Sequence, residues 1–101
     1  MLMTSTISDA WAVLGDPLRR RLVELLAAEQ LCTCHLVEET GAKQPTVSHH
    51  LKVLREAGVV DVEPRGRFTW YRLRPEVLEQ LAADLAGLAD AARTATVRGA
   101  C

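Results

Sequence analysis

Residues 44–58 have the sequence Gln44-Pro-Thr-Val-Ser-His-His-Leu-Lys-Val-Leu-Arg-Glu-Ala-Gly58, and this stretch decides the fold. Val47, Leu51 and Leu54 recur at fourth and third positions, so they form one apolar stripe along a helix. The polar side chains outside that stripe can exchange hydrogen bonds with base edges and phosphates. They are Thr46, Ser48, His49, Lys52 and Arg55. A short helix that buries one face and presents such groups on the other suits the major groove of DNA, so we predict a DNA-recognition helix.

Proline and glycine mark the ends of this helix and of the one before it. Pro45 lies in the first turn of the recognition helix, where a missing amide donor costs nothing, and Gly58 supplies a left-handed stop. A shorter helix covers roughly residues 33–40 and ends at Gly41. Helix, tight turn and recognition helix therefore follow one another in helix-turn-helix order.

Two more helices are predicted before this pair. Ile7, Trp11 and Leu14 mark a first amphipathic helix. Asp16 followed by Pro17 is an N-cap acid with proline in the first helical position, and it starts the second helix. The apolar face of that second helix consists of Leu18, Leu22, Leu25 and Leu26.

Beyond the recognition helix, apolar residues no longer recur at the spacing of a helix but at every second position, as in a strand. Residues 60–63 alternate valine with acidic side chains, residues 64–67 form a turn, and residues 68–73 are aromatic and β-branched. This pattern predicts a β-hairpin. Arg65 and Arg67 lie at its tip, where a wing can rest on the DNA backbone or enter a minor groove.

Pro75 opens a last helix, whose apolar stripe is more than a small monomer can cover. We expect that stripe to pack, together with the first helix, against a partner subunit. The stripe consists of Leu78, Leu81, Leu85, Leu88 and Ala92. The predicted fold is mainly α with a small β-hairpin, a winged helix-turn-helix of order α-α-α-α-β-β-α that dimerises through its first and last helices. It forms one domain over residues 1–101, with a core at 8–92 and a mobile tail at 93–101.

Length and composition agree with a small helical domain. The chain has 101 residues, 49% of them apolar and only 4% aromatic. A domain of this size buries roughly 60–70% of the surface that its unfolded chain exposes. No apolar run approaches the roughly 20 residues of a membrane helix, and the first residues lack a signal-peptide pattern. We therefore expect a cytoplasmic protein with no membrane partner.

Charge is concentrated in one part of the chain. The formal net charge is −1, which by itself does not favour a nucleic-acid partner. Residues 1–42 carry three arginines against six acids, residues 43–74 seven basic residues against three acids, and residues 75–101 two arginines against four acids. The three segments therefore have net charges of −3, +4 and −2, respectively. The basic segment holds the predicted recognition helix and wing, as expected of a domain that meets phosphate along one edge.

A second chemical feature is the segment Leu31-Cys-Thr-Cys-His-Leu36, at the start of the third helix. In a reducing cytoplasm, closely spaced cysteines are typical of metal-binding or redox-active sites, and thiolates select soft ions. Residues two apart on a regular helix point about 200° from each other. We therefore expect Cys32 and Cys34 to hold one ion only if the first turn unwinds or deforms, which would strain the helix that supports the recognition helix. His35 is expected to be a helix-surface residue.

These features together resemble the ArsR/SmtB family of winged helix-turn-helix repressors. Three motifs over residues 8–92 carry the resemblance: Leu14-Gly-Asp-Pro-Leu-Arg-Arg-Arg-Leu22, the stretch 44–58, and the wing end Trp70-Tyr-Arg-Leu73. The resemblance implies a homodimer that binds an inverted-repeat operator in double-stranded DNA and releases it when an inducer binds.

The resemblance also implies roles for individual residues. Base contacts fall on Gln44, Thr46, Ser48 and His49, and contacts nearer phosphates on Lys52, Arg65 and Arg67. Lys43 stands where many members have a serine that caps the recognition helix. This departure removes a cap worth about 1 kcal/mol and adds a cation beside the DNA.

The cysteine segment resembles the metalloid site of arsenic-responsive members, whose pattern is Cys-x-Cys-x-x-Cys. Cys32 and Cys34 match its first two positions, whereas the third position is Val37. Cys101, at the end of the chain, is a candidate third ligand from either subunit. The leading hypothesis is a repressor of an arsenic-resistance operon, induced by trivalent arsenic or antimony and using no organic cofactor.

Two alternatives use the same cysteines. The pair acts as a redox switch in one, and as the site of a metal-buffering protein in the other. The second alternative gives no reason for the basic segment. An enzyme is not expected, because the sequence has no phosphate loop, no hydrolase elbow and no carboxylate–histidine pair suited to acid–base catalysis.

Overall fold

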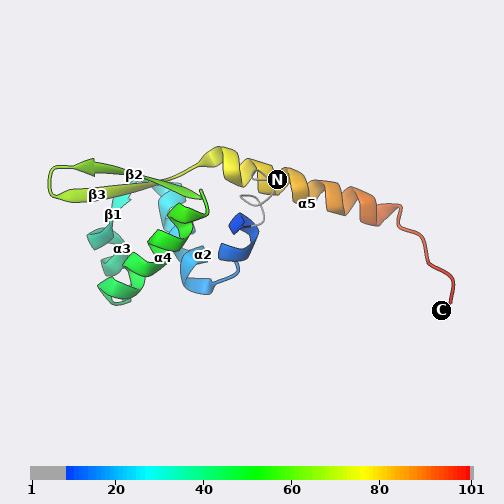
Figure 1. Ribbon diagram of the computed structural model, residues 1–101, viewed down its shortest axis with the longest axis horizontal. Coiled ribbons are helices and arrows are strands. Elements are labelled where there is room, and N and C mark those ends of the chain that lie inside the picture. The colour runs from blue at the N-terminus through cyan, green and yellow to red at the C-terminus, as the bar shows by residue number, and fades with distance from the viewer. Residues whose placement is uncertain (1–8, 101) are drawn as a thin grey trace.

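The computed structural model describes residues 9–100 (Figure 1). Residues 9–13 form a short helix, in agreement with the predicted first helix, although Ile7 lies outside the described residues. The elements that follow are α2 (Pro17–Ala28), β1 (Leu31–Cys32), α3 (Thr33–Thr40), α4 (Gln44–Glu56), β2 (Val60–Arg65), β3 (Phe68–Leu73) and α5 (Pro75–Arg93). The predicted order of four helices, a hairpin and a last helix is confirmed, with β1 as an addition.

The helix ends follow the predicted local chemistry. The Asp16 carboxylate accepts a hydrogen bond from the amide of Arg19 at 3.0 Å and so caps α2. Proline occupies one of the first two positions of α2, α4 and α5. Gly41 (φ 71°) and Gly58 (φ 79°) adopt the left-handed conformation after α3 and α4. As predicted, the side chain of Lys43 makes no capping bond at the start of α4.

The sheet differs from the predicted hairpin because a third strand joins it. The strand order is β1-β3-β2, so β3 is central, and β1 pairs Leu31 with Tyr71 and Cys32 with Trp70. Sequence periodicity cannot show a two-residue strand, because such a strand exists only through its pairing with a distant partner. Between β2 and β3, Arg65 pairs with Phe68 and leaves Gly66 (φ 64°) in a tight turn.

The core lies where α2, α3 and α4 meet the base of the sheet. Its fully buried side chains are Leu22, Leu36, Val47, Leu51, Leu54, Val59 and Val60. The apolar stripe predicted for residues 44–58 is thus buried, and the opposite face of α4 is left open. Among the residues that the structure describes, no helix has both the length and the apolar character needed to cross a bilayer.

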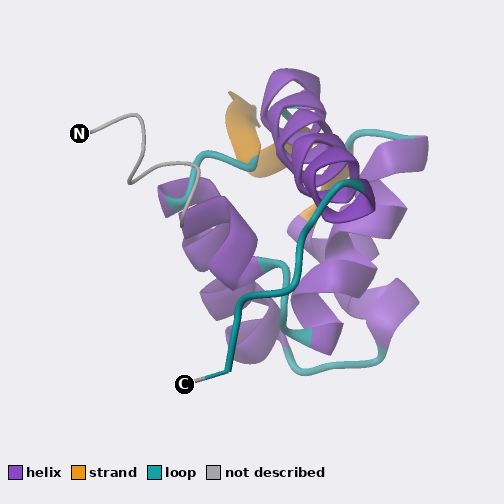
Figure 2. Cartoon of the chain, turned by 90° about the vertical axis from the view of Figure 1, so that its right-hand side faces the viewer, coloured by secondary structure: helices purple, strands orange, loops and turns teal. Residues whose placement is uncertain are grey.

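α5 leaves this core and extends along the long axis of the molecule (Figure 1). Figure 2 looks from the C-terminal end of α5 and shows the other helices gathered below it. Val77 and Leu81 near its start are buried, whereas Leu85 is 52% exposed and Leu88 is 63% exposed. Trp11, Leu14, Leu81 and Leu85 line a shallow apolar groove of about 280 Å³. Within residues 9–100, the second half of the predicted stripe is therefore not covered.

The N-cap of α2 predicts a pH-dependent contribution to stability. The pKa of Asp16 lies below its ordinary value of 3.8, first because the Arg19 amide donates to the carboxylate and then because His50 and Arg19 lie nearby. A lowered pKa stabilises the fold above 3.8, and this contribution is lost as the pH falls through the folded-state pKa.

Asp16→Asn keeps a capping oxygen but cannot titrate. We expect the urea midpoint of the wild type to fall more steeply than that of the variant between about pH 5 and about pH 3. Parallel pH profiles of the two proteins would contradict this role of the carboxylate.

Candidate DNA interface and thiol site

The open face of α4 holds most of the residues predicted to contact DNA. Lys43, Gln44, Thr46, Ser48, His49 and Lys52 are all exposed. They surround the start of the helix and its outer side, opposite the buried stripe. Because no part of the described chain covers these side chains, α4 can enter a groove without any rearrangement of the core.

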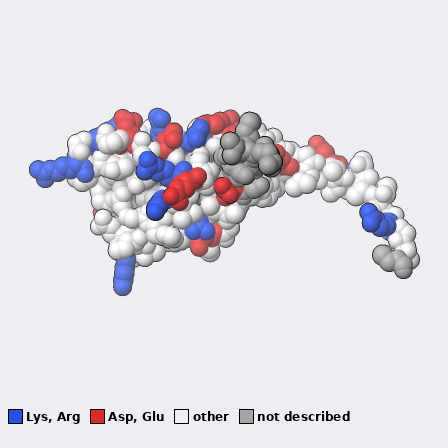
Figure 3. All heavy atoms as spheres, viewed as in Figure 1, with Lys and Arg blue, Asp and Glu red and all other residues white. Residues whose placement is uncertain are grey.

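The wing arginines differ from each other. Arg65 ends β2 rather than lying at the tip: its Nε donates to the Glu63 carboxylate at 3.1 Å, and its guanidinium lies 5.9 Å from the Trp70 ring centre. The bond from Arg65 lowers the pKa of Glu63 below its usual range. Arg67 lies in the turn, is exposed, and has no ion pair within residues 9–100. Basic side chains project from the hairpin end of the molecule and below the α3–α4 turn (Figure 3).

One contact ties the recognition helix to the N-terminal part of the chain. Arg19 donates from Nε to the Val13 carbonyl at 2.7 Å, and its Nη1 lies 3.0 Å from His50 Nδ1. The Asp16 carboxylate lies 3.9 Å from the same ring nitrogen. His50 is therefore a packing residue, whereas its neighbour His49 faces outward. Sequence patterns did not indicate the role of Arg19, since it depends on a contact across 31 positions.

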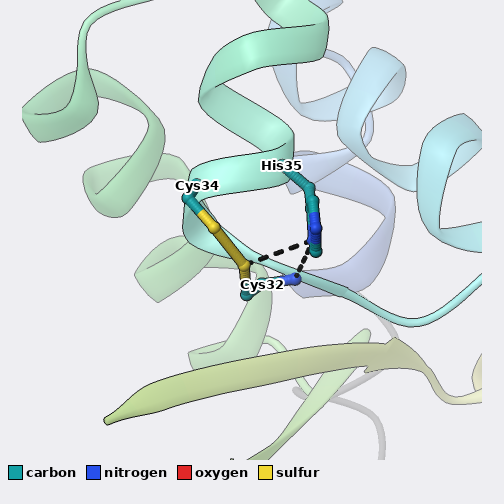
Figure 4. Close-up of a disulfide and its surroundings, with 3 residues drawn as sticks. All are labelled: Cys32, Cys34 and His35. Atoms are coloured by element: carbon teal, nitrogen blue, oxygen red, sulfur yellow. Dashed lines mark hydrogen bonds between the residues drawn. A yellow bond between two sulfur atoms is a disulfide. The ribbon is translucent and has the colours of Figure 1, made fainter.

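The two cysteines lie at the junction of β1 and α3 and are joined by a disulfide (Figure 4). Cys32 is 3% exposed and is the N-cap of α3 in an extended conformation, whereas the exposed Cys34 lies in the first helical turn. The premise that both cysteines lie within one regular helix was therefore wrong. Since Cys32 precedes the helix, its sulfur already reaches that of Cys34.

His35 is the third member of this cluster. Its Nδ1 accepts a hydrogen bond from the Cys32 amide at 3.2 Å and lies 3.2 Å from the Cys32 sulfur. The donor atoms of Cys32, Cys34 and His35 lie within 4.8 Å of one another. His35 is exposed, as predicted, but it also belongs to the cluster. The three-residue spacing from Cys32 to His35, which places an N-cap beside position N3, was the available sequence signal.

Two further positions bear on the third ligand that the metalloid pattern expects. Val37 is partly buried against the core and has no donor atom. Cys101 lies outside the described residues.

The thiol site and the wing share one sheet. Cys32 pairs with Trp70 of β3, and the rings of His35 and Trp70 lie 5.4 Å apart. On the wing, the Arg65 guanidinium lies over the same Trp70 ring. The Trp70 side chain thus lies against both His35 of the thiol cluster and the basic side chain of Arg65 in the wing.

An open recognition helix, a basic wing and a helix-turn-helix core define a winged helix-turn-helix DNA-binding protein. Comparison with known proteins agrees with this class. The sequence profile of the bacterial regulatory proteins of the arsR family matches residues 16–62.

Two curated relatives are regulators. An arsenic resistance transcriptional regulator of Pseudomonas putida is 42% identical over 79 residues, which cover 77% of this chain and 62% of that protein. An arsenical resistance operon repressor of Staphylococcus aureus is 33% identical over 78% of this chain and 76% of its own length. A crystal structure of a possible transcriptional regulator for arsenical resistance has 37% identity and a TM-score of 0.73, covering 88% of this chain and 98% of that one.

The chain therefore belongs to the ArsR family. It is a DNA-binding transcriptional repressor and not an enzyme, as the sequence predicted.

The exposed position of Arg67 in the turn predicts a sequence-independent contribution to DNA binding. We expect Arg67→Ala to weaken binding to all duplexes and to reduce the slope of log affinity against log salt by about one unit, as loss of one phosphate contact should. Fluorescence anisotropy over a salt series measures this slope. Arg98→Ala removes an equal charge far from the wing, and it should leave the slope unchanged; an unaltered slope in Arg67→Ala itself would count against the wing contact.

Proposed function

We propose that this protein is a homodimeric repressor of an arsenic-resistance operon that leaves its operator when trivalent arsenic or antimony binds Cys32 and Cys34. The observation that carries the proposal is the disulfide between these residues, because two sulfurs that can bond to each other can also hold one small ligand. The names of the arsenical resistance regulators among the relatives support the choice of ligand.

The chemistry of binding is a thiol exchange at arsenic. The disulfide is first reduced by a cellular dithiol, which transfers two electrons and two protons and gives two thiols. Each As–S bond then forms as a thiol proton and an arsenic-bound hydroxide leave together as water. Thiolates favour this exchange because they are soft donors.

Binding at this place acts on the recognition helix through α3. Cys32 and Cys34 hold the first turn of α3, and α3 packs against both α2 and α4. The fully buried Leu36 lies in the following turn of α3. Arsenic fixes the separation of the two sulfurs, which is free in the reduced protein, and this constraint acts on the first turn of α3. Because a packed core does not deform continuously, a shift of that turn moves α3 against α4 and changes the angle at which α4 meets the groove.

On DNA, we assign base contacts to Gln44, Thr46, Ser48 and His49, and backbone contacts to Lys43, Lys52, Arg65 and Arg67. Their exposure and the +4 charge of residues 43–74 support this assignment. Two-fold symmetry then places two recognition helices about one DNA turn apart on an inverted repeat.

The dimer contact is assigned to the uncovered stripe of α5 and to the short helix at residues 9–13. Leu85, Leu88 and Trp11 are large exposed apolar side chains, and two of them, Trp11 and Leu85, line the groove between the two helices. Burial of such a surface against a second copy is the usual reason for exposed apolar area of this kind.

The disulfide also favours a second candidate, a redox-sensing repressor. In that case a peroxide oxidises one thiolate to a sulfenic acid with loss of hydroxide, and the other thiol displaces water to close the Cys32–Cys34 bond. The oxidised state would then be the one that leaves DNA.

Replacing both cysteines separates these candidates. We expect Cys32→Ser with Cys34→Ser to bind operator DNA as the reduced wild type does, within about twofold, but to ignore arsenite, because its hydroxyls are hard donors. Anisotropy of the protein–operator complex, titrated with arsenite and separately with peroxide, measures release. Wild-type release by peroxide alone would favour the redox candidate, and arsenite release of the double variant would overturn the thiol assignment.

The dimer assignment is tested on α5. Leu88→Glu puts a charge into the proposed contact, and we expect the dimer dissociation constant to rise at least about tenfold because an unpaired buried charge is costly. Val97→Glu adds the same charge at a residue that is 97% exposed and outside the stripe, so it serves as the matched control. Sedimentation equilibrium measures both, and a Leu88→Glu protein that dimerises like the control would refute the interface.

A further inference from the structure

We propose that Arg19 is a positioning residue for operator recognition, which sets the orientation of α4 in the groove through His50 and does not itself contact DNA. This inference rests on the proposed base contacts of α4 and is independent of the thiol site. It gives a role in DNA binding to a residue of α2, outside the helix-turn-helix pair and the wing.

The Arg19 residue joins three helices. Its amide donates to the Asp16 carboxylate at 3.0 Å and so completes the N-cap of α2. Its Nε donates at 2.7 Å to the carbonyl of Val13, which ends the short helix at residues 9–13, where carbonyls lack a partner within the helix. Its Nη1 lies 3.0 Å from His50 Nδ1 on α4. Because two of these bonds lie within the N-terminal part of the chain, the guanidinium is already fixed there when it meets α4.

The two arginines that follow Arg19 behave differently. Arg20 and Arg21 are exposed, and each lies 3.7 Å from the Glu24 carboxylate one turn further along α2. Arg19 is partly buried and its side chain points toward α4, which packs against α2 (Figure 1). The inward direction of Arg19 is therefore a property of this position and not of the basic run as a whole.

His50 lies at the border between the two faces of α4. Its side chain is 16% exposed, whereas the ring of the neighbouring His49 lies 5.4 Å away on the open face. A rotation of α4 about its own axis moves His50 relative to Arg19, and it moves the proposed base-contacting side chains by the same angle. The bond between Arg19 and His50 therefore restrains the rotation on which base contacts depend.

A directional bond adds a restraint that apolar packing does not give. The buried stripe of α4 determines which face is open, but the hydrophobic effect has no preferred direction. A hydrogen bond weakens steeply as its angle departs from linearity. Recognition side chains have to be held within about 0.5 Å and about 10–20° of their working geometry. We therefore assign the small rotations of α4 to the control of Arg19.

The bond also requires a neutral His50. A guanidinium has donors only, so Nδ1 is the acceptor and the ring proton lies on Nε2. Within residues 9–100, the charged and titratable groups that face this ring are Arg19, His49 and Asp16, whose carboxylate lies 3.9 Å from Nδ1. A proton on Nδ1 replaces the bond to Arg19 by attraction to Asp16. The restraint on α4 is thus lost within the interval of about pH 5 to about pH 8 in which histidines change charge.

The test measures how strongly the reduced full-length chain prefers one duplex over another. The specific probe is the duplex that the wild-type protein selects from a random library, and the reference probe is a scrambled duplex of the same length and composition. Fluorescence anisotropy gives both affinities, and their quotient is the specificity ratio. A change that only weakens the fold lowers both affinities and leaves this ratio unchanged.

Arg19→Met keeps the length of the side chain and removes its donors. We expect the specificity ratio to fall at least about fivefold, because base contacts depend on orientation whereas phosphate contacts carry no sequence information. Arg20→Met removes the same charge from the same helix, and as the matched control it should keep the ratio within about twofold of the wild type.

His50→Leu removes the acceptor from the other side of the bond and should lower the ratio as Arg19→Met does. The double variant should lie within about twofold of either single variant, because both changes break one interaction. Losses that add up would show two independent roles and would overturn the proposal. His50→Leu also carries the test if Arg19→Met does not fold, which thermal unfolding of each variant reveals.

The pH profile supplies a readout that general support of the fold would not change. His50→Asn puts an oxygen acceptor near the position of Nδ1 and cannot be protonated. Between about pH 8 and about pH 5.5, we expect the specificity ratio of the wild type to fall at least about threefold more than that of His50→Asn. His49 is present in both proteins, so its titration cancels in this comparison.

Two results would overturn the role of Arg19 and leave the base contacts of α4 intact. One is an equal pH profile of the wild type and His50→Asn, and the other is a specificity ratio of Arg19→Met equal to that of Arg20→Met. A wild type that binds selected and scrambled duplexes equally would instead refute the proposed base contacts, and this inference with them.

Discussion

Burial of one stripe of α4 is the constraint on which the rest of the molecule depends. Val47, Leu51 and Leu54 have no exposed surface, and their burial turns the opposite face of the same helix toward solvent. A helix fixed in this way cannot rotate to bury its polar side. Its supports, α2 and α3, therefore determine where the polar face points, and a shift at the start of α3 would be passed to α4 through this packing.

The thiol cluster is also connected to the wing through the sheet. β3 is the central strand: it pairs with Cys32 on one edge and with the outer strand of the wing on the other. Trp70 on this strand contacts both His35 and Arg65. The same few residues therefore connect the thiol cluster at one end of β1 to the basic hairpin beyond it, and the packing of α3 on α4 is a second connection from this cluster.

The helices could be predicted because the residues that start and end them are close in sequence to the helix ends. Asp16, Gly41 and Gly58 act within a few residues of their own position, and each was found where the sequence placed it. The exposed DNA-facing residues followed from the same periodicity. Features that depend on pairing with a distant segment could not be predicted. The main example is β1, because two residues are too few to show the alternation of apolar and polar side chains that marks a strand.

That missing strand also explains the error in the thiol geometry. A helix drawn through both cysteines separates their sulfurs, whereas the strand pairing holds Cys32 in an extended conformation just before the helix begins. The contact between Arg19 and His50 was missed for a similar reason, since it joins two motifs that lie 31 positions apart.

The separation of charge has a kinetic consequence. The hairpin lies at one end of a molecule 61 Å long, the acidic α5 extends to the other end, and the whole chain has a net charge of only −1. The basic end of each protomer therefore presents a positive local field to a polyanion although the net charge is slightly negative. Diffusional encounter with the duplex is then steered by this local field rather than by overall attraction, and its rate depends on ionic strength more than the net charge would suggest.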